Sequence, residues 1–524
     1  MSTTVASPNP TSVWTPKANP WLIACVVSLA AFMEVLDTSI ANVALPHIAG
    51  NLGASSDEST WVLTSYLVSN AIILPITGWL VSLIGRKKFF LICITVFTVS
   101  SLLCGIAPTL PFLLLARVIQ GIGGGGLQPM AQAILADTFP PSKRGLAFSV
   151  YGMTAIVAPA IGPTIGGWIT DDYSWRWIFL MNLPVGILAL FLVFTFVEDP
   201  PFLRRTTLQE SKVDYWGFGL LAVGVGFLQI VLDKGQEDDW FGSNFIITLS
   251  VISVIALVAL ILWELRVKQP ILDVRLFKNA NFATSCVIMF VVGAASFSTT
   301  VLMPQYLQNL MGYTAESAGM VLSVAAIILL IELPIVGRLT AVIQARYLMA
   351  FGWAALTIAM FYSTRRIDLQ MSFASATWLR IAQYVPMGFI FIPATMVAYL
   401  GVPPEKNNAV AGLVNFVRNI GAGVGTSVVT TVLGRRTQVH QLMLSNHTGL
   451  TNRMFQSTTS SMAARGGQTA AYARLYGSML SQAATLSYID TFWILGIATG
   501  IMFVLSFLLR KNHLHKPDPA TLAH

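Results

Sequence analysis

Fourteen apolar segments run through this sequence, and each is long enough to cross a lipid bilayer as an α-helix. A membrane-spanning helix needs about 20 mostly apolar residues. Segments that meet this requirement lie near residues 21–45, 60–83, 89–107, 111–135, 146–170, 177–197, 215–232, 244–264, 280–305, 315–337, 346–363, 374–400, 409–434 and 489–509. Only 10% of the 524 residues are charged, against roughly 25% in soluble domains. We therefore predict an all-α integral membrane protein, which excludes an ordinary soluble enzyme.

The positive charges predict how the chain is oriented. The net charge of +8 needs no nucleic-acid partner, because basic residues at helix ends are what membrane insertion requires. An even number of spans puts both termini on one side, and most of the 31 Lys and Arg fall on that side. The positive-inside rule therefore predicts cytoplasmic termini. The polar segment 1–20 lacks the features of a removable signal peptide, so we expect the first span to be retained.

The chain contains an internal repeat. Five residues of the first half recur 263 positions later without a gap: Arg117, Gln120, Pro140, Pro141 and Lys143 return as Arg380, Gln383, Pro403, Pro404 and Lys406. Spans seven and eight have no counterpart. We predict a tail at 1–20, a six-helix bundle at 21–200, two inserted helices with their loops at 201–278, a second six-helix bundle at 279–510 that includes a long outer loop at 435–487, and a tail at 511–524. Substrate is then expected between the halves, near the midplane.

A glycine turn and a basic cluster, Gly78 to Lys88, join spans two and three. Glycines let helix ends approach closely, and the cations hold the loop at the anionic inner surface. The segment resembles the signature loop of the major facilitator superfamily, which implies conformational roles for Gly78, Gly85 and Arg86. Ser82 stands where that family usually has Asp, so the gating role of that carboxylate does not carry over.

Span five is rich in proline and glycine. Pro159 and Pro163 free backbone carbonyls and kink the helix, while Gly162, Gly166 and Gly167 permit close packing on a neighbour. The alternative is a generic packing face of small residues. The pattern resembles the span-five motif of antiporters in the same superfamily.

Three further segments resemble one branch of this superfamily. Leu36 to Pro46 in span one and Trp175 to Pro184 at span six are similar to the fourteen-helix drug:proton antiporters, and Leu228 to Phe241 resembles a junction in the inner-membrane transporter of tripartite multidrug pumps. The resemblance implies a major facilitator fold and proton-coupled efflux of amphipathic toxic compounds. It also implies a periplasmic adaptor, an outer-membrane channel and a location in the inner membrane.

Ionisable residues inside spans usually face a cavity or a partner. Asp37 in span one and Arg117 in span four both lie about 9 Å from the outer surface at 1.5 Å rise per residue, so an ion pair between them is expected. Glu34, three residues before Asp37, shares its helical face. We predict that these three residues form the proton-coupling site. The alternative is a purely structural pair that holds two helices together.

Seven other polar residues within spans are candidates for the substrate cavity: Gln120, Gln128, Glu332, Arg380, Gln383, Asn415 and Arg418. Glu332 precedes a proline and is expected to face a cytoplasmic cavity, where it would attract cationic substrates. Span nine contains no carboxylate that could pair with Arg380, which favours a structural role for Arg380 and Gln383. For Asn415 and Arg418, packing and substrate contact remain equal alternatives.

The sequence gives no sign of catalysis or of a bound cofactor. It contains no Walker loop, so ATP is not expected as the energy source, and no cluster with metal-ligand spacing. Three alternatives to multidrug efflux remain: export of a single metabolite, such as a siderophore or a lipid, uptake by proton symport, and a polytopic membrane enzyme, for which no loop shows a catalytic arrangement. For the outer loop 435–487 we expect an amphipathic helix at Gln468–Ala484 and contact with the adaptor.

Overall fold

The computed structural model describes residues 16–201, 214–267, 270–446, 448 and 452–508. Helices dominate the described residues, and fourteen of their helical segments are long and apolar enough to span a membrane. The predicted fold class and number of spans are confirmed. Most of the tails predicted at 1–20 and 511–524, and part of the loop region within 201–278, lie outside the described residues.

The first six spans form one half of the molecule. Spans one to three are single helices, and spans four to six are interrupted. In order they are α1 (Pro20–Leu52), α2 (Ser56–Ile84), α3 (Arg86–Gly105), α4 (Leu110–Gly124) with α5 (Leu127–Thr138), α6 (Arg144–Gly152) with the π-helical η1 (Met153–Val157) and α7 (Ala158–Asp172), and the short α8 (Trp177–Leu180) with α9 (Asn182–Phe196).

The remaining spans form the inserted pair and the second half. The inserted pair is α10 (Tyr215–Lys234) and α11 (Asn244–Arg266). The second half contains α12 (Ala280–Asn309), α13 (Ala315–Val342), α14 (Ala345–Arg366), α15 (Phe373–Ala398), α16 (Asn407–Ser445) and α18 (Gln468–Leu505), with α17 (Arg453–Gly466) between the last two. Short 3-10 turns, η2 (Trp240–Gly242), η3 (Val274–Lys278), η4 (Pro404–Lys406) and η5 (Ser506–Leu508), follow or precede these helices.

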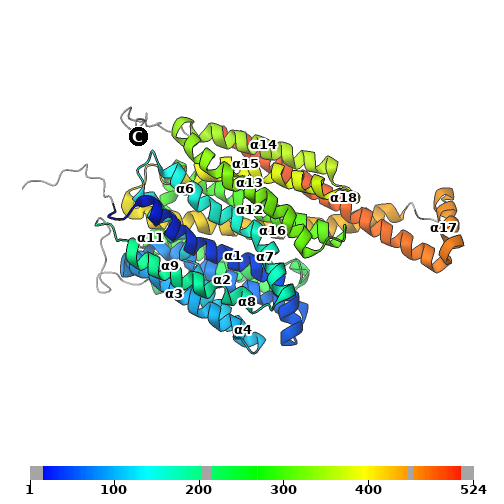
Figure 1. The fold of residues 1–524 in the computed structure, drawn as a ribbon, viewed down its shortest axis with the longest axis horizontal. Coiled ribbons are helices and arrows are strands. Elements are labelled where there is room, and N and C mark those ends of the chain that lie inside the picture. Colours follow the sequence, from blue (N-terminus) through cyan, green and yellow to red (C-terminus); the bar gives the residue numbers. More distant parts are fainter. Residues whose placement is uncertain (1–15, 202–213, 268–269, 447, 449–451, 509–524) are drawn as a thin grey trace, which may run out of the picture.

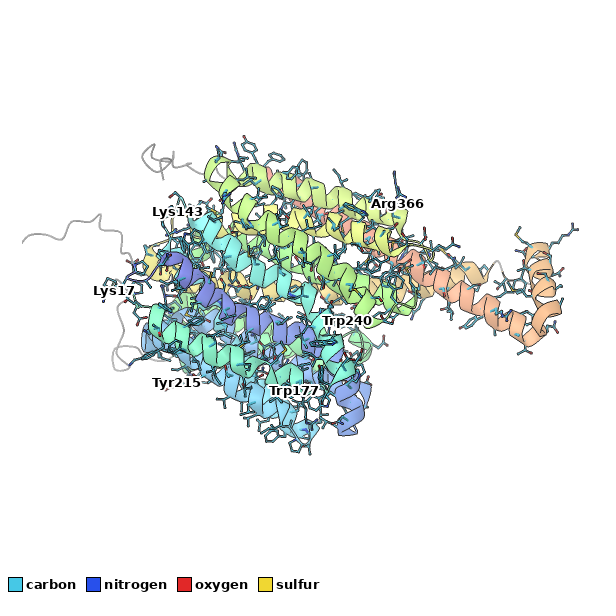
Figure 2. The ribbon with its side chains drawn as sticks, in the orientation of Figure 1. Lys17, Lys143, Trp177, Tyr215, Trp240 and Arg366 are labelled. Atoms are coloured by element: carbon cyan, nitrogen blue, oxygen red, sulfur yellow. The ribbon has the colours of Figure 1, made fainter. Side chains whose placement is uncertain are left out.

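The spans run side by side, so that connections fall alternately at two ends of the bundle (Figure 1). Lys17, Lys143 and Tyr215 lie at one end, which we call the Lys143 end, and Trp177, Trp240 and Arg366 lie at the other, which we call the Trp177 end (Figure 2). The two halves contact each other mainly through α2 and α5 with α16, α7 with α13, and α6 with α13 and α15.

The inserted pair packs on the seam between the halves. α10 contacts α11, α2 and α16. Lys234 at the C-terminal end of α10 is buried and donates to the carbonyl of Asp57 at 3.2 Å and to Thr60. Trp240 donates to Thr431 of α16 at 2.9 Å. The pair is therefore attached to both halves near the Trp177 end.

The segment 435–487 differs from the predicted loop. α16 continues to Ser445, and Gln468–Ala484 is the first part of α18, which runs without a break into the last span. Together with α17 these helices project beyond the Trp177 end (Figure 1). The polarity of the segment predicts a loop, but a polar segment can also be helical, because a helix needs an apolar run only where it spans a membrane.

Candidate functional site

The Asp37–Arg117 ion pair is buried between helices of the first half. Arg117 of α4 donates to Asp37 of α1 at 2.7 Å, and the side chains are 0% and 1% exposed. Asn182 of α9 and Gln120 donate to the other carboxylate oxygen at 2.6 and 3.1 Å. The ion pair predicted from matched depth is therefore present, and every oxygen of the carboxylate has a donor.

Arg117 makes further contacts that hold it without the carboxylate. Its guanidinium donates to the carbonyl of Val62 at 3.1 Å and to Gln120 at 2.7 Å. It also lies over the ring of Tyr66, 4.4 Å from the centroid. Cation–π contacts of this kind stabilise a desolvated guanidinium.

Glu34 belongs to a second network, one helical turn from Asp37. It accepts from Tyr66 at 2.9 Å and from Asn70 at 3.1 Å, both on α2, and from Gln128 of α5 at 2.6 Å. Glu34 is 3% exposed and has no cation within ion-pair distance among the described residues. Tyr66 touches both Glu34 and Arg117, and Arg117 pairs with Asp37, so the two carboxylates are linked through Tyr66 and Arg117.

The Glu34 network crosses to the second half. Gln128 accepts from Arg418 of α16. Tyr151 of α6 donates to Asn415 at 2.8 Å, and Asn415 donates to Gln132 at 2.5 Å. Polar residues of α16 therefore meet the first half at the level of Glu34, and Asn415 and Arg418 both take part.

The repeat places Arg380 in the second half where the first half has Arg117, but it does not supply a counter-ion like Asp37. Arg380 is fully buried and donates to Thr300 at 2.8 Å and to Gln383 at 3.4 Å. Its guanidinium lies 3.8 Å from the centroid of the Tyr384 ring. Thr300 stands 263 positions after Asp37, so a hydroxyl replaces the carboxylate. Within the described residues no carboxylate pairs with Arg380.

A pocket lies between span five and the second half. Its lining comes from η1, α7, α12, α15 and α16, and consists of Ala155, Ile156, Pro159, Val292, Gly293, Ser296, Phe297, Thr300, Tyr384, Phe391 and Arg418. Of the seven predicted cavity candidates, Arg418 alone lines this pocket directly. Gln128 is joined to the pocket by its hydrogen bond to Arg418, and Arg380 lies behind Thr300 and Tyr384. Asn415 bonds to Tyr151, which is outside the lining.

Glu332 lies outside this pocket, on α13 where it meets α15. A Cβ added to Gly388 of α15 would approach its carboxylate to 2.7 Å. Both carboxylate oxygens are buried and have no partner among the described residues. The expected role in attracting cations is therefore independent of the lining of the pocket.

We expect the Glu332→Met substitution to stabilise the folded protein by about 1 to 3 kcal/mol, because a buried polar group without partners is costly. Methionine has a similar volume and no such cost. Thermal unfolding of the purified protein in detergent measures the change, with Glu332→Gln as the control that keeps a polar end. A Met variant less stable than wild type would show that the carboxylate has a stabilising partner.

The signature loop forms a buried cluster at the Lys143 end. Arg86 at the start of α3 pairs with Asp137 near the end of α5, and the two side chains are 1% and 2% exposed. Asn408 of α16 accepts from Arg86 at 3.1 Å, and Asn407 donates to Asp137. We call these four residues the latch. It joins the two halves, and Asp137 supplies a carboxylate that is absent at Ser82.

Glycines of the signature loop and of span five allow close contacts. Gly78 lies against Ala409 of α16, where an added Cβ would be 2.8 Å from the backbone, and Gly85 has a φ of 89° that favours glycine. Gly162 and Gly166 lie against Ser39 and Ile40 of α1. Gly167 has no atom within 4 Å of its added Cβ, so no described neighbour packs on it.

The prolines of span five open the helix backbone as expected. Pro163 has no N–H to donate to the carbonyl of Pro159, four residues earlier. Ser39 of α1 donates to that carbonyl instead, at 3.0 Å. The π-helical turn η1 ends two residues before Pro159, and residues of η1 and Pro159 line the pocket. The irregular backbone thus lies beside the cavity.

Sequence reasoning missed several residues of the site. Tyr66 and Asn70 sit one turn apart in an apolar span, which marks a polar face, but nothing in the sequence shows that this face meets Glu34. Asp137 lies at the end of a span, where a carboxylate is unremarkable. The repeat could have identified Thr300, because the offset of 263 that relates Arg117 to Arg380 also relates Asp37 to Thr300.

Comparison with known proteins agrees with this geometry. The family model described as Major Facilitator Superfamily matches residues 27–426. The multidrug export protein EmrB of Escherichia coli strain K12 is 37% identical over 485 residues, which cover 92% of this chain and 93% of that protein. The fatty acid resistance protein FarB of Neisseria gonorrhoeae is 37% identical over 446 residues, which cover 84% and 87% of the two chains.

Solved structures agree in fold. The crystal structure of the human organic anion transporter MFSD10 superposes with a TM-score of 0.55 at 12% sequence identity, covering 92% of this chain and 100% of that one. At this level of identity the likeness concerns the arrangement of helices alone.

Proposed function

The chain belongs to the major facilitator superfamily, and we propose that it is a proton-coupled multidrug efflux antiporter for amphipathic toxic compounds. The family and the similarity to EmrB-type exporters confirm the expected resemblance and identify a transporter rather than an enzyme. The proton coupling, the direction of transport and the partners are the proposed parts.

One observation carries the proposal: two buried carboxylates are linked through Tyr66 and Arg117, and one of them is connected to the pocket. Asp37 and Glu34 both contact Tyr66 or its cation–π partner Arg117. Gln128 then joins Glu34 to Arg418, which lines the pocket. Ligand binding at Arg418 can therefore change the hydrogen bonds of a carboxylate that exchanges protons. Antiport requires such a link, since binding of the substrate must change the affinity for the proton, and the reverse.

Both halves contact each other on either side of the pocket. Thr164 of α7 bonds to Ser323 of α13 at 2.9 Å towards the Trp177 end, and the latch closes the Lys143 end. The pocket is thus enclosed between two sets of inter-half contacts. Opening one set while the other stays closed would give alternating access.

Everted membrane vesicles test the function. Vesicles that contain the protein should accumulate an amphipathic dye when their interior is acidified, and should release protons when dye is added. The matched control is vesicles with the Asp37→Asn variant at the same protein level. Accumulation that ignores the pH gradient would rule out proton coupling, and movement in the opposite direction would indicate uptake.

We propose that the Lys143 end faces the cytoplasm of a cell with an inner and an outer membrane. Most Lys and Arg of the chain belong to this end by the predicted topology. The two six-helix halves and the inserted pair are then the structural units, with boundaries near residues 200 and 279. A cysteine introduced near Lys143 and one introduced near Trp177 should react with impermeant maleimide from opposite sides of the membrane.

We further propose that the projecting helices bind a periplasmic adaptor, which would connect the transporter to an outer-membrane channel. The ends of α16 and α18 and the helix α17 enclose a groove lined by Gln438, Gln441, Leu442, Ser445, Thr448, Phe455, Tyr472, Leu475, Tyr476 and Met479. Segment 435–487 carries five arginines and no Asp or Glu. A groove with apolar and aromatic residues, on a segment with a net positive charge, suits an amphipathic segment with acidic residues.

Two polar substitutions in this groove should remove adaptor binding. We expect the double variant Leu442→Ser and Tyr476→Ser to lose about tenfold or more in cross-linking to a co-expressed periplasmic adaptor, because apolar anchors carry most of the binding energy of an interface. Met454→Ser is the control, since Met454 is 78% exposed but outside the groove. Unchanged cross-linking in the double variant would place the adaptor contact elsewhere.

A further inference from the structure

Asp233 of the inserted helix α10 is a carboxylate within a span, and it has no part in the proposed function. It is half-buried and lies one residue before the C-terminal end of α10. Its Oδ1 accepts from Gln229 at 3.1 Å, and the hydroxyl of Thr64 on α2 lies beside the carboxylate. Its Oδ2 is buried and makes no hydrogen bond to a described residue. An unpaired buried carboxylate oxygen is costly, and protonation or a water molecule removes this cost.

The charged groups around Asp233 leave it without a counter-ion. Lys234, the next residue, pairs with Glu237 at 2.6 Å. Arg436 of α16 pairs with α18 instead, and α11 carries no charged residue between 244 and 263. Among the residues that the structure describes, no Lys, Arg or His lies within ion-pair distance of Asp233. A proton on this carboxylate therefore breaks no ion pair.

Polar side chains continue from Gln229 to the proposed proton site. Gln229 is 5% exposed and lies opposite Gly423 of α16, where an added Cβ would be 3.7 Å from the amide nitrogen of Gln229. Asn419, one helical turn before Gly423 on the same face of α16, donates to Asn70 of α2 at 3.4 Å. Asn70 donates in turn to Glu34 at 3.1 Å. We call the following four residues the polar file: Asp233, Gln229, Asn419 and Asn70.

The polar file begins near the Trp177 end and leads into the bundle. α10 ends at Lys234, shortly before Trp240, which lies at that end (Figure 2). Four residues of an α-helix advance about 6 Å. The steps from Asp233 to Gln229 and from Gly423 to Asn419 therefore advance together by about 12 Å.

A second buried polar atom without a partner lies on the helix that faces α10. An added Cβ on Gly226 of α10 would be 3.5 Å from Val68 and from Ile72 of α2, so these two residues mark the face of α2 that meets α10. Ser65 is on this face, three residues before Val68. Its hydroxyl is buried and makes no hydrogen bond to a described residue. Water between α2 and α10 would satisfy both Ser65 and Asp233.

From these contacts we infer that Asp233 is a further protonation site and that the polar file conducts protons between the Trp177 end and Glu34. Asp233 would take a proton from solution at that end and pass it through bridging water to Glu34, which restores the Asp233 carboxylate. The amides do not titrate, but they can order the water molecules along which the proton moves. Chains of polar and acidic side chains within spans are typical of such relays.

The inserted pair would then supply part of the proton route and not only a link between the halves. This inference rests on the proposed function, because it requires Glu34 to exchange protons.

Everted vesicles with the Asp233→Asn variant test the route. Dye accumulation driven by an acidic interior should slow by about tenfold or more, because a proton-transfer group is lost. Exchange of labelled for unlabelled dye at equal pH needs no net proton transfer and should be unchanged. Asp233→Glu should restore most of the rate, since it keeps a carboxylate. Asp172→Asn is the control, because Asp172 is exposed at the end of α7, which belongs to a different span.

A second pair of variants leaves every ionisable group in place. Gly423→Leu should put a side chain between Gln229 and Asn419 and slow proton-driven accumulation as Asp233→Asn does. Gly423→Ala is the matched control, because its Cβ would meet Leu232 at 3.4 Å and Gln229 at 3.7 Å, which are ordinary contact distances. A wild-type rate of proton-driven accumulation in Asp233→Asn or in Gly423→Leu would overturn the inference.

Infrared difference spectra between low and high pH test the protonation of Asp233 without transport. The full chain in nanodiscs should show the C=O band of a protonated carboxyl group that is absent from Asp233→Asn and present in Asp172→Asn. Identical spectra of wild type and Asp233→Asn would show that Asp233 takes up no proton.

The proposed function and this inference fail separately. If wild-type vesicles ignore the pH gradient, the proposed antiport is wrong, whatever Asp233 does. If they follow the gradient and Asp233→Asn follows it equally, the antiporter stands and the proton route through the inserted pair is wrong.

Discussion

The Asp37→Asn protein should insert and fold, yet export driven by a pH gradient should fall by about 100-fold or more. Asparagine keeps the shape of the side chain and an acceptor for Asn182, but it cannot release or take up a proton. If Asp37 carries the coupled proton, its loss removes the driving force while leaving the pocket intact. Dye accumulation in everted vesicles with an imposed pH gradient measures the loss, at matched protein level.

The second half shows why this variant should fold. Removing one member of a buried ion pair can cost roughly 3 to 5 kcal/mol, because an uncompensated charge is left behind. Arg380, however, is buried with Thr300 where Arg117 has Asp37, and it is held by Gln383 and the Tyr384 ring. Arg117 has the same kinds of contact with Gln120 and Tyr66. The fold therefore already accommodates an arginine of this type without a carboxylate.

Asp37→Thr is the matched variant, because it copies the second half. It should also fold and lose coupling. Substrate-induced proton release from purified protein separates the two readings of Asp37. If Asp37→Asn releases protons as wild type does, Asp37 does not carry the proton. If neither variant can be recovered as folded protein, the Asp37–Arg117 ion pair is required for folding.

The sequence predicts the spans and the Asp37–Arg117 pair for simple physical reasons. A span is recognised by the length of its apolar run, because the thickness of the bilayer sets that length. The pair was found because both residues lie at a known number of residues from a membrane surface, and the rise per residue of a helix converts that number to depth.

The hydrogen-bond partners of each carboxylate are harder to predict from the sequence. Glu34 and Asp37 share a helical face, which predicts one coupled pair, but they bond to different helices: Glu34 to α2 and α5, Asp37 to α4 and α9. Periodicity gives the face of a helix and not the helices that cover it. The latch is not predictable for the same reason, since Asn408 and Arg86 are 322 positions apart in the sequence.

The latch leads to the second large effect that we expect. Asp137→Asn should shift the protein towards a state that is open at the Lys143 end. The substitution leaves Arg86 buried without its counter-ion, which costs roughly 3 to 5 kcal/mol in the closed state. Opening that end returns the guanidinium to water and removes most of this cost. The closed-to-open ratio should therefore fall by about 100-fold or more, since each 1.4 kcal/mol is about tenfold.

Maleimide labelling of a cysteine at Thr340 measures the shift. Thr340 is 8% exposed and lies against Gly145 where the halves meet at this end, so it should react only when the end opens; the four native cysteines are first replaced by serine. Asn408→Ala, which removes one inter-half hydrogen bond to Arg86, should give a smaller increase, about tenfold. Asp171→Asn is the control, because that exposed residue pairs with His47 at 3.5 Å at the Trp177 end. Equal labelling in all three variants would mean that the latch does not hold the halves together, and closure would then rest on the packing of Gly78 against Ala409 and of Gly145 against Thr340.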